Sequence, residues 1–237
     1  MKTLSEQLKK NYSIIPACDV SVERYEELIK ATADVDGVSA YKLGFVLALS
    51  IGLPRAVEIA RKYTDKPLIY DHQKAATDIP ETGEKFMKTC KAAGIDAVIL
   101  FPQAGPETEK AWIQAAQDEE LGVIVGGLMT HKGYAQSDGG WLADDAILEI
   151  YLTAVKCGVT EFVVPGSKPM AIRKIRKMLE RENIAPVFYS PGIGAQGGVI
   201  AESLAAAGGK WHPIIGRAIY NAEDMQAAAK SFFAQLT

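Results

Sequence analysis

The sequence has few of the residues from which metal and redox sites are built. Among its 237 residues there are three cysteines and three histidines. The cysteines are Cys18, Cys90 and Cys157, and the histidines are His72, His131 and His212. Neither set has the close spacing of metal ligands. We therefore expect no metal, and we expect the thiols to be buried or incidental in a reducing compartment.

Long apolar runs and a strong charge of either sign are also missing. No segment has the roughly 20 apolar residues that span a bilayer, and the first residues, MKTLSEQLKKNY, lack the apolar core of a signal peptide. The net charge of -3 gives no reason to expect nucleic acid or an anionic membrane as a partner. There is no GxGxxG after the first apolar run and no P-loop. We expect a soluble, cytoplasmic protein without a nicotinamide or nucleoside-triphosphate cofactor.

Eight short apolar runs recur along the whole chain. They lie at 13–20, 40–45, 67–71, 96–101, 122–128, 161–166, 186–192 and 212–218. Each run is too short to predict a helix with confidence, and each resembles a strand that is buried on both faces. Strands of this kind are typical of parallel sheets.

Segments with the helical period separate these runs. They include 22–33, 53–63, 83–93, 108–120 and 145–158. Gly94 and Gly158 stand where two of these helices should stop. Eight strand–helix alternations predict an α/β protein with a (β/α)8 TIM barrel. A doubly wound open sheet is the structural alternative, but its glycines would typically gather in one early loop.

The chain shows no sign of a division into domains. There is no linker rich in proline and serine and no change in composition, so we expect one barrel domain over residues 1–237. The segment before Ser13 is expected to form a short helix that caps the bottom of the barrel. The chemistry of such barrels lies at the carboxyl ends of the strands.

Charged residues follow the first three predicted strands. They are Asp19, Lys42, Asp71, Lys74 and Asp78. If the last four converge, the carboxylates hold the lysine ammonium groups protonated and oriented. Lys42 needs such partners, because YKLGF is otherwise an apolar strand. The alternative is a solvated cluster of ion pairs on the rim of the barrel.

Glycines and an arginine follow the last two predicted strands. The stretch SPGIGAQGG occupies 190–198, and Gly216 and Arg217 follow the eighth strand. Barrels often bind phosphate at this pair of loops. Glycines let backbone N–H groups approach anionic oxygens, and arginine adds charge-assisted hydrogen bonds. The sequence therefore favours a phosphate site here over glycines that only permit tight turns.

Four motifs stand at these strand ends. They are D-x-x-K-x-x-x-D-I-P from Asp71, M-T-H-K-G from Met129, S-P-G-I-G-A-Q-G-G from Ser190 and I-I-G-R-A-I-Y from Ile214. Together they resemble the orotidine 5′-phosphate decarboxylase family in its prokaryotic monofunctional form, and the resemblance begins at Asp19 and covers nearly the whole chain. The last two motifs are highly specific. The acid–lysine motif is shared with sugar-phosphate enzymes of the same suprafamily.

The resemblance implies a reaction that needs neither metal nor cofactor: decarboxylation of orotidine 5′-monophosphate to uridine 5′-monophosphate, the last step of pyrimidine synthesis. It implies that Asp19 binds the ribose hydroxyls, that Lys42 holds the ribose and the charge array, and that Asp71 faces the substrate carboxylate. Lys74 would protonate the carbon that loses carbon dioxide. Thr130 stands where the family usually has a serine that touches the pyrimidine.

The resemblance also implies a homodimer with a shared site. Asp78 would enter the neighbour's site across the dimer interface, and Ile79 would line the pocket for the substrate carboxylate. Gln196 and Arg217 would hold the phosphate, with Gly216 nearby. The loop that contains Gln196 would close over the bound phosphate.

One motif departs from the family's usual spacing. The family has D-x-K-x-x-D, whereas here two residues separate Asp71 from Lys74 and three separate Lys74 from Asp78. Each added residue in an extended segment turns the following side chains to the opposite face, so a bulge or tight turn must return Lys74 to the cavity. Without it, His72 or Gln73 would take the direction of the usual lysine.

Two other functions remain open at this point. The first is a sugar-phosphate decarboxylase or aldolase of the same suprafamily, which would use a magnesium ion on an enediolate. The acidic ligand that such an enzyme has near its second strand is not found here. The second is a nucleotide-binding barrel that has kept the phosphate site and lost the chemistry.

Overall fold

Eight parallel strands form the centre of the molecule in the computed structural model, which describes residues 3–72, 77–194 and 200–236. The strands are β1 (Ile15–Pro16), β2 (Tyr41–Gly44), β3 (Leu68–Asp71), β4 (Ala97–Leu100), β5 (Gly122–Gly126), β6 (Glu161–Val163), β7 (Val187–Ser190) and β8 (Trp211–Ile215). Their order in the sheet is β1-β8-β7-β6-β5-β4-β3-β2.

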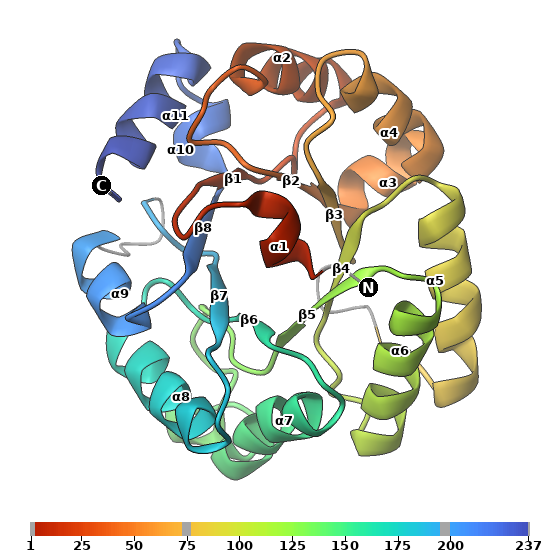
Figure 1. Cartoon of the computed structure of the whole chain (residues 1–237), viewed down its shortest axis with the longest axis vertical. Helices are drawn as coiled ribbons and strands as arrows, with labels where there is room; N and C mark the ends of the chain where they lie inside the picture. Colours follow the sequence, from red (N-terminus) through yellow and green to blue (C-terminus); the bar gives the residue numbers. More distant parts are fainter. Residues whose placement is uncertain (1–2, 73–76, 195–199, 237) are drawn as a thin grey trace.

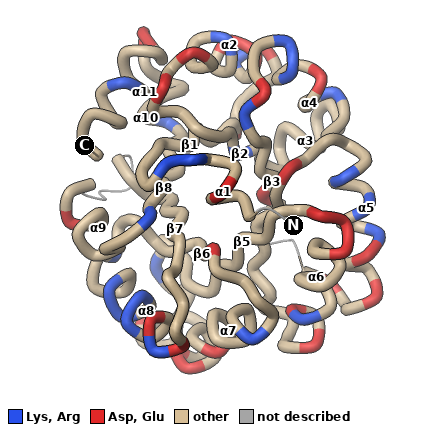
Figure 2. The backbone as a smooth tube through the Cα atoms, viewed as in Figure 1, with Lys and Arg blue, Asp and Glu red and all other residues tan. Residues whose placement is uncertain are grey.

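Helices surround the strands and cover the outer face of the barrel (Figure 1). The helices are α1 (Leu4–Leu8), α2 (Val22–Thr32), α3 (Phe45–Ile51), α4 (Leu53–Arg61), α5 (Gly83–Ala92), α6 (Pro106–Asp118), α7 (Asp144–Lys156), α8 (Pro169–Arg181), α9 (Ile200–Ala207), α10 (Arg217–Tyr220) and α11 (Met225–Ala234), with 3-10 turns η1 (Pro80–Thr82) and η2 (Gln136–Asp138). The positions of lysine, arginine, aspartate and glutamate lie mainly along these outer helices and the loops (Figure 2).

The sheet closes on itself through β1. On one side β1 pairs with β8, where Ile15 lies opposite Ile214. On the other side β1 meets β2 through isolated bridges, among them Ala17 with Lys42. The N–H of Cys18 also donates to the carbonyl of Lys42 at 2.8 Å. The two ends of the strand order therefore meet, which confirms the predicted (β/α)8 barrel and excludes the open sheet.

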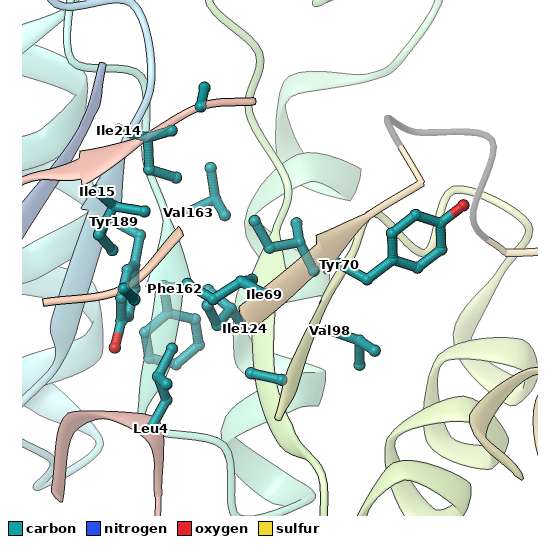
Figure 3. Close-up of a cluster of buried hydrophobic side chains, with 14 of the residues drawn as sticks. Leu4, Ile15, Ile69, Tyr70, Val98, Ile124, Phe162, Val163, Tyr189 and Ile214 are labelled. Carbon is teal, nitrogen blue, oxygen red and sulfur yellow. The ribbon is translucent and has the colours of Figure 1, made fainter. Parts of the chain in front are cut away.

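Large apolar side chains of the strands form the hydrophobic core. Ile69, Ile124, Phe162 and Tyr189 come from four different strands, are completely buried, and belong to the cluster drawn in Figure 3. Burial of a side chain of this size stabilises a fold by about 1.5–3 kcal/mol. The short apolar runs of the sequence therefore supply the core.

Helix α1 covers the amino-terminal end of the barrel (Figure 1). A capping box starts it, because Thr3 N donates to Glu6 Oε2 at 2.8 Å and Glu6 N donates to Thr3 Oγ1 at 3.3 Å. Leu4 is completely buried beside the core (Figure 3), and Ser5 N donates to Oε1 of Glu161 at 2.6 Å. Glu161 is the first residue of β6. The predicted cap at the bottom of the barrel is confirmed.

The boundaries of the elements differ from the predictions at several places. The first strand is shorter than predicted, because its outer residues form isolated bridges instead of a continuous ladder. The second ends at Gly44, and Phe45 begins α3. Gly94 and Gly158 end their helices as predicted, with φ angles of 85° and 82°. Among the helices of the described part of the chain, none has the length and apolar character needed to span a membrane.

Candidate active site

A cavity of about 210 Å³ opens at the carboxyl ends of the strands, where the barrel fold places active sites. Six residues that the sequence analysis selected line it: Asp19, Lys42, Asp71, Thr130, Gly216 and Arg217. They come from the first, second, third, fifth and eighth strands or the loops that follow them. Residues far apart in the sequence therefore share one site.

Lys42 lies between two carboxylates on the wall of this cavity. Its Nζ is 3.1 Å from Oδ2 of Asp19 and 3.1 Å from Oδ2 of Asp71. Lys42 and Asp71 are buried, and Asp19 is partly exposed. Lys42 is on β2, and Asp71 is the last residue of the neighbouring β3. Asp71 lies opposite Gly44, two residues beyond Lys42, so the two side chains are on the same face of the sheet. Lys42 therefore has the acidic partners that a lysine in an apolar strand needs, and Asp71 is the one of them that the predicted array contains.

The charge on Lys42 follows from this geometry. Burial by itself lowers the pKa of a lysine, but the carboxylates of Asp71 and Asp19 raise it by more, so the pKa of Lys42 lies above its ordinary value. The ammonium group therefore stays charged at neutral pH and is held in one direction. Buried charges are costly, and replacement by apolar residues often stabilises a protein. Such an array therefore points to a function in binding or catalysis.

Arg217 supplies a second cation to the same cavity. It begins α10 directly after β8, its side chain is exposed, and it has no ion pair with another residue of the described chain. The preceding Gly216 also lines the cavity, and a Cβ there would be crowded, at 3.3 Å from Cε1 of Tyr220. An unpaired guanidinium beside open backbone is suited to an anionic group such as phosphate.

The loop after β5 brings Thr130 to the cavity, and two tyrosines hold that loop. The hydroxyl of Tyr151 accepts a hydrogen bond from Leu128 N at 3.0 Å and donates to a carbonyl of β6 at 2.8 Å. The hydroxyl of Tyr134 donates to the carbonyl of Gly127 at 2.8 Å. These tyrosines were missed in the sequence analysis, since nothing in a single sequence connects a tyrosine hydroxyl with the backbone groups that it contacts in the fold.

The apolar wall of the cavity was also missed. It includes Ile99 and Phe101 from the fourth strand and its end, Val163 from β6 and Tyr220 from α10. A signal was available for two of them, because Phe101 ends the fourth predicted strand and Tyr220 ends the I-I-G-R-A-I-Y motif. An apolar wall of this kind suits the flat ring of a base or nucleoside.

Asp78 and Ile79 lie outside this cavity. Both are exposed, with 56% of Ile79 accessible, and they follow β3 in the loop that leads to η1. Their backbone is anchored to α6, because Thr108 Oγ1 donates to the carbonyl of Asp78 at 3.0 Å and Trp112 Nε1 donates to that of Ile79 at 3.1 Å. Within one chain, neither residue lines the cavity that the described residues form.

Two of the predicted residues, Lys74 and Gln196, lie outside the described residues, so their roles stay predictions. The structure does describe His72, which was the alternative to Lys74 as the side chain that points into the cavity. Its ring packs against Phe86, with centroids 5.8 Å apart, and its Nδ1 forms a hydrogen bond with the hydroxyl of Tyr70. Phe86 belongs to α5 on the outside of the barrel. The imidazole of His72 therefore does not point into the cavity.

The other two histidines also do not line the cavity. His212 is completely buried, Ser13 Oγ is 2.7 Å from its Nδ1, and burial lowers the pKa of His212 to about 3. His131 packs edge-on against Tyr134. Cys18 and Cys90 are buried free thiols. In residues 3–72, 77–194 and 200–236, no three histidine, cysteine or acidic side chains are grouped as metal ligands.

A (β/α)8 barrel with a lysine–carboxylate array and an arginine at its mouth defines a class of barrel proteins suited to phosphorylated ligands. Comparison with known families identifies the family within this class. The model of the orotidine 5′-phosphate decarboxylase / HUMPS family matches residues 13–232. The chain belongs to this family, which confirms the resemblance seen in its motifs.

Individual relatives agree with the family match. The chain is 36% identical over 224 residues to orotidine 5′-phosphate decarboxylase of Methanosarcina mazei, covering 94% of each chain. It is 35% identical to the enzyme of that name from Pyrococcus furiosus, covering 94% of this chain and 97% of the other. A crystal structure of orotidine 5′-monophosphate decarboxylase from Methanocaldococcus jannaschii, complexed with inhibitor BMP, is 28% identical. It matches with a TM-score of 0.82, covering 95% of this chain and 99% of the other.

Proposed function

We propose that this protein decarboxylates orotidine 5′-monophosphate to uridine 5′-monophosphate, the last step of pyrimidine nucleotide synthesis. Membership of the family and the printed names of its relatives support this reaction. The observation in the structure that carries the proposal is the buried Lys42 between Asp19 and Asp71, in a cavity that Arg217 also lines.

The reaction needs charge that is fixed in place before the substrate arrives. When carbon dioxide leaves the pyrimidine ring, the electron pair of the broken carbon–carbon bond stays on the ring carbon, and a proton must then be added there. Preorganised cations stabilise such a carbanion. In our proposal Asp71 lies against the substrate carboxylate, and Lys42 and Asp19 bind the ribose hydroxyls. Lys74, outside the described residues, gives the proton.

The phosphate group is bound away from the bond that breaks. In our proposal Arg217 and Gln196 hold it, while Thr130 contacts the pyrimidine. Binding energy from a remote group accelerates a reaction when it is used to assemble the catalytic charges around the reacting atom. The guanidinium of Arg217 can therefore affect turnover although it touches no reacting atom.

We also propose that two chains form a homodimer that completes each site. In this proposal Asp78 enters the partner's cavity and Ile79 lines the pocket for the substrate carboxylate. The exposed position of both residues supports the proposal, since neither serves its own chain's cavity. Helix α3 adds exposed apolar side chains, with 47% of Val46 and 78% of Leu49 accessible. Exposed apolar groups of this size are typical of contact surfaces.

A direct assay tests the reaction. Purified protein is mixed with orotidine 5′-monophosphate, and the loss of the orotate-ring absorbance is followed with and without a chelator. We expect turnover in both cases, and we expect Lys74→Ala and Lys42→Ala to abolish it. Lys62→Ala is the matched control, because Lys62 pairs with Glu26 on the exposed outer helices.

Each rival function gives a different result. No turnover of orotidine 5′-monophosphate, together with turnover of a sugar phosphate that disappears with the chelator, would favour a magnesium-dependent sugar-phosphate enzyme. Tight binding of uridine 5′-monophosphate with no turnover at all would favour a nucleotide-binding barrel.

A further inference from the structure

Arg24 joins helix α2 to the backbone that follows Arg217. Its Nε donates to the carbonyl of Tyr220 at 2.8 Å, and its Nη2 donates to the carbonyl of Ala222 at 3.3 Å. Its Nη1 donates to Oε2 of Glu27 at 2.8 Å. All three guanidinium nitrogens thus have a partner, and a lysine cannot reproduce this planar fork.

Helix α10 depends on support of this kind. It has only four residues, Arg217–Tyr220, which is too few for a helix to be stable by itself. The last carbonyls of any helix lack partners within the helix, and a cation at that end satisfies them. Arg24 supplies this cation to α10. Because Arg217 is the first residue of the same helix, the support that Arg24 gives to α10 also fixes the backbone of Arg217.

The backbone of Arg24 is tied to the other side of the cavity. Arg24 lies in the first turn of α2, and its N–H donates to Oγ of the N-cap residue Ser21 at 3.4 Å. Asp19, two residues before Ser21, is the partner of Lys42. A single side chain therefore connects the segment that carries Asp19 with the helix that carries Arg217.

From these contacts we infer that Arg24 is a positioning residue, which fixes Arg217 relative to Asp19 so that the phosphate and ribose of one nucleoside 5′-monophosphate are bound together. Arg24 does not itself line the cavity. The inference rests on the proposed function for the class of its ligand, but it does not depend on turnover. According to this inference, Arg24 sets the distance between the phosphate subsite and the ribose subsite.

Calorimetric binding of two ligands tests the inference. Uridine 5′-monophosphate spans both subsites, whereas uridine lacks the phosphate. We expect Arg24→Ala to weaken binding of the monophosphate about tenfold, the effect of losing one well-placed charged contact. Uridine affinity should remain that of the wild type. Arg24→Lys should show the same selective loss, and it keeps the comparison usable if Arg24→Ala does not fold.

The matched control is Arg55→Ala. Arg55 makes an i,i+3 ion pair with Glu58 on α4, as Arg24 does with Glu27 on α2, but it lacks the hydrogen bonds that Arg24 makes within the described chain to the carbonyls of Tyr220 and Ala222. Its removal should leave both affinities unchanged. An equal loss for uridine and its monophosphate, or no loss for either, would overturn the assignment of Arg24. A wild-type protein that binds the monophosphate but does not decarboxylate orotidine 5′-monophosphate would contradict only the proposed function.

Discussion

Glu109 is a buried acid outside the active site, and it should make the stability of the protein depend on pH. It lies in the first turn of α6, 1% of it is exposed, and its Oε1 has no hydrogen-bond partner among the described residues. Burial raises the pKa of Glu109 to about 8 from an ordinary value of 4.5. The neutral form is therefore strongly favoured in the folded protein.

The sign and size of the effect follow from this pKa. Because the folded state holds its proton more tightly than the unfolded state, the favourable contribution is complete below about pH 4.5. It is lost as the pH rises through 8. Each unit of raised pKa corresponds to about 1.4 kcal/mol, which gives an upper limit of about 5 kcal/mol. Relaxation and water entry reduce such penalties, so we expect a loss of about 1–3 kcal/mol.

Glu109→Gln removes the titration and keeps the shape of the side chain. The free energy of unfolding is measured by urea denaturation at pH 5 and pH 8.5 for the variant and the wild type. The variant minus wild-type difference in this free energy should be about 1–3 kcal/mol larger at pH 8.5 than at pH 5. Glu107→Gln is the control, since Glu107 is exposed on the same helix and pairs with Lys110. A difference between the Glu109 variant and the wild type that is the same at both pH values would refute the reasoning.

Three further predictions concern the cavity, the surface and the cap. Arg217→Ala should lower kcat/KM for orotidine 5′-monophosphate by about a hundredfold or more, through loss of the phosphate contact, and an unchanged kcat/KM would contradict this role. Leu49→Arg should shift sedimentation from dimer to monomer and lower activity on dilution, whereas Met170→Arg, at another exposed apolar residue, should not. Leu4→Ala should reduce the free energy of unfolding, measured in urea, by about 3 kcal/mol, because the side chain of Leu4 in α1 is fully buried. Met170→Ala should change this free energy little.

The general fold could be predicted because its signal is local. Short apolar runs that alternate with helical periods are the direct result of burying parallel strands under helices. The site was also predictable in part, because polar residues at the carboxyl ends of parallel barrel strands all lie at the same end of the barrel. The pairing of Lys42 with Asp19 and Asp71 follows from a lysine in an apolar strand, which needs partners.

Other features depend on loop conformation and on contacts between distant segments, which a single sequence does not show. Whether His72 or its neighbours enter the cavity depends on how the chain bends after Asp71, and the structure answers this only for His72. The support that Arg24 gives to α10 joins residues from the two ends of the chain. No local pattern marks such contacts, because a surface arginine looks the same with or without a carbonyl partner.

The pairing of β1 with β8 has a consequence for the newly made chain. The continuous ladder of β1 is formed with the last strand, so a ribosome-bound chain that still lacks β8 leaves Ile15 without the neighbour that Ile214 provides. Arg217 is translated later still. A nascent chain can therefore assemble the Lys42–Asp71 pair early, but the phosphate contact that we propose for Arg217 can form only when synthesis is almost complete.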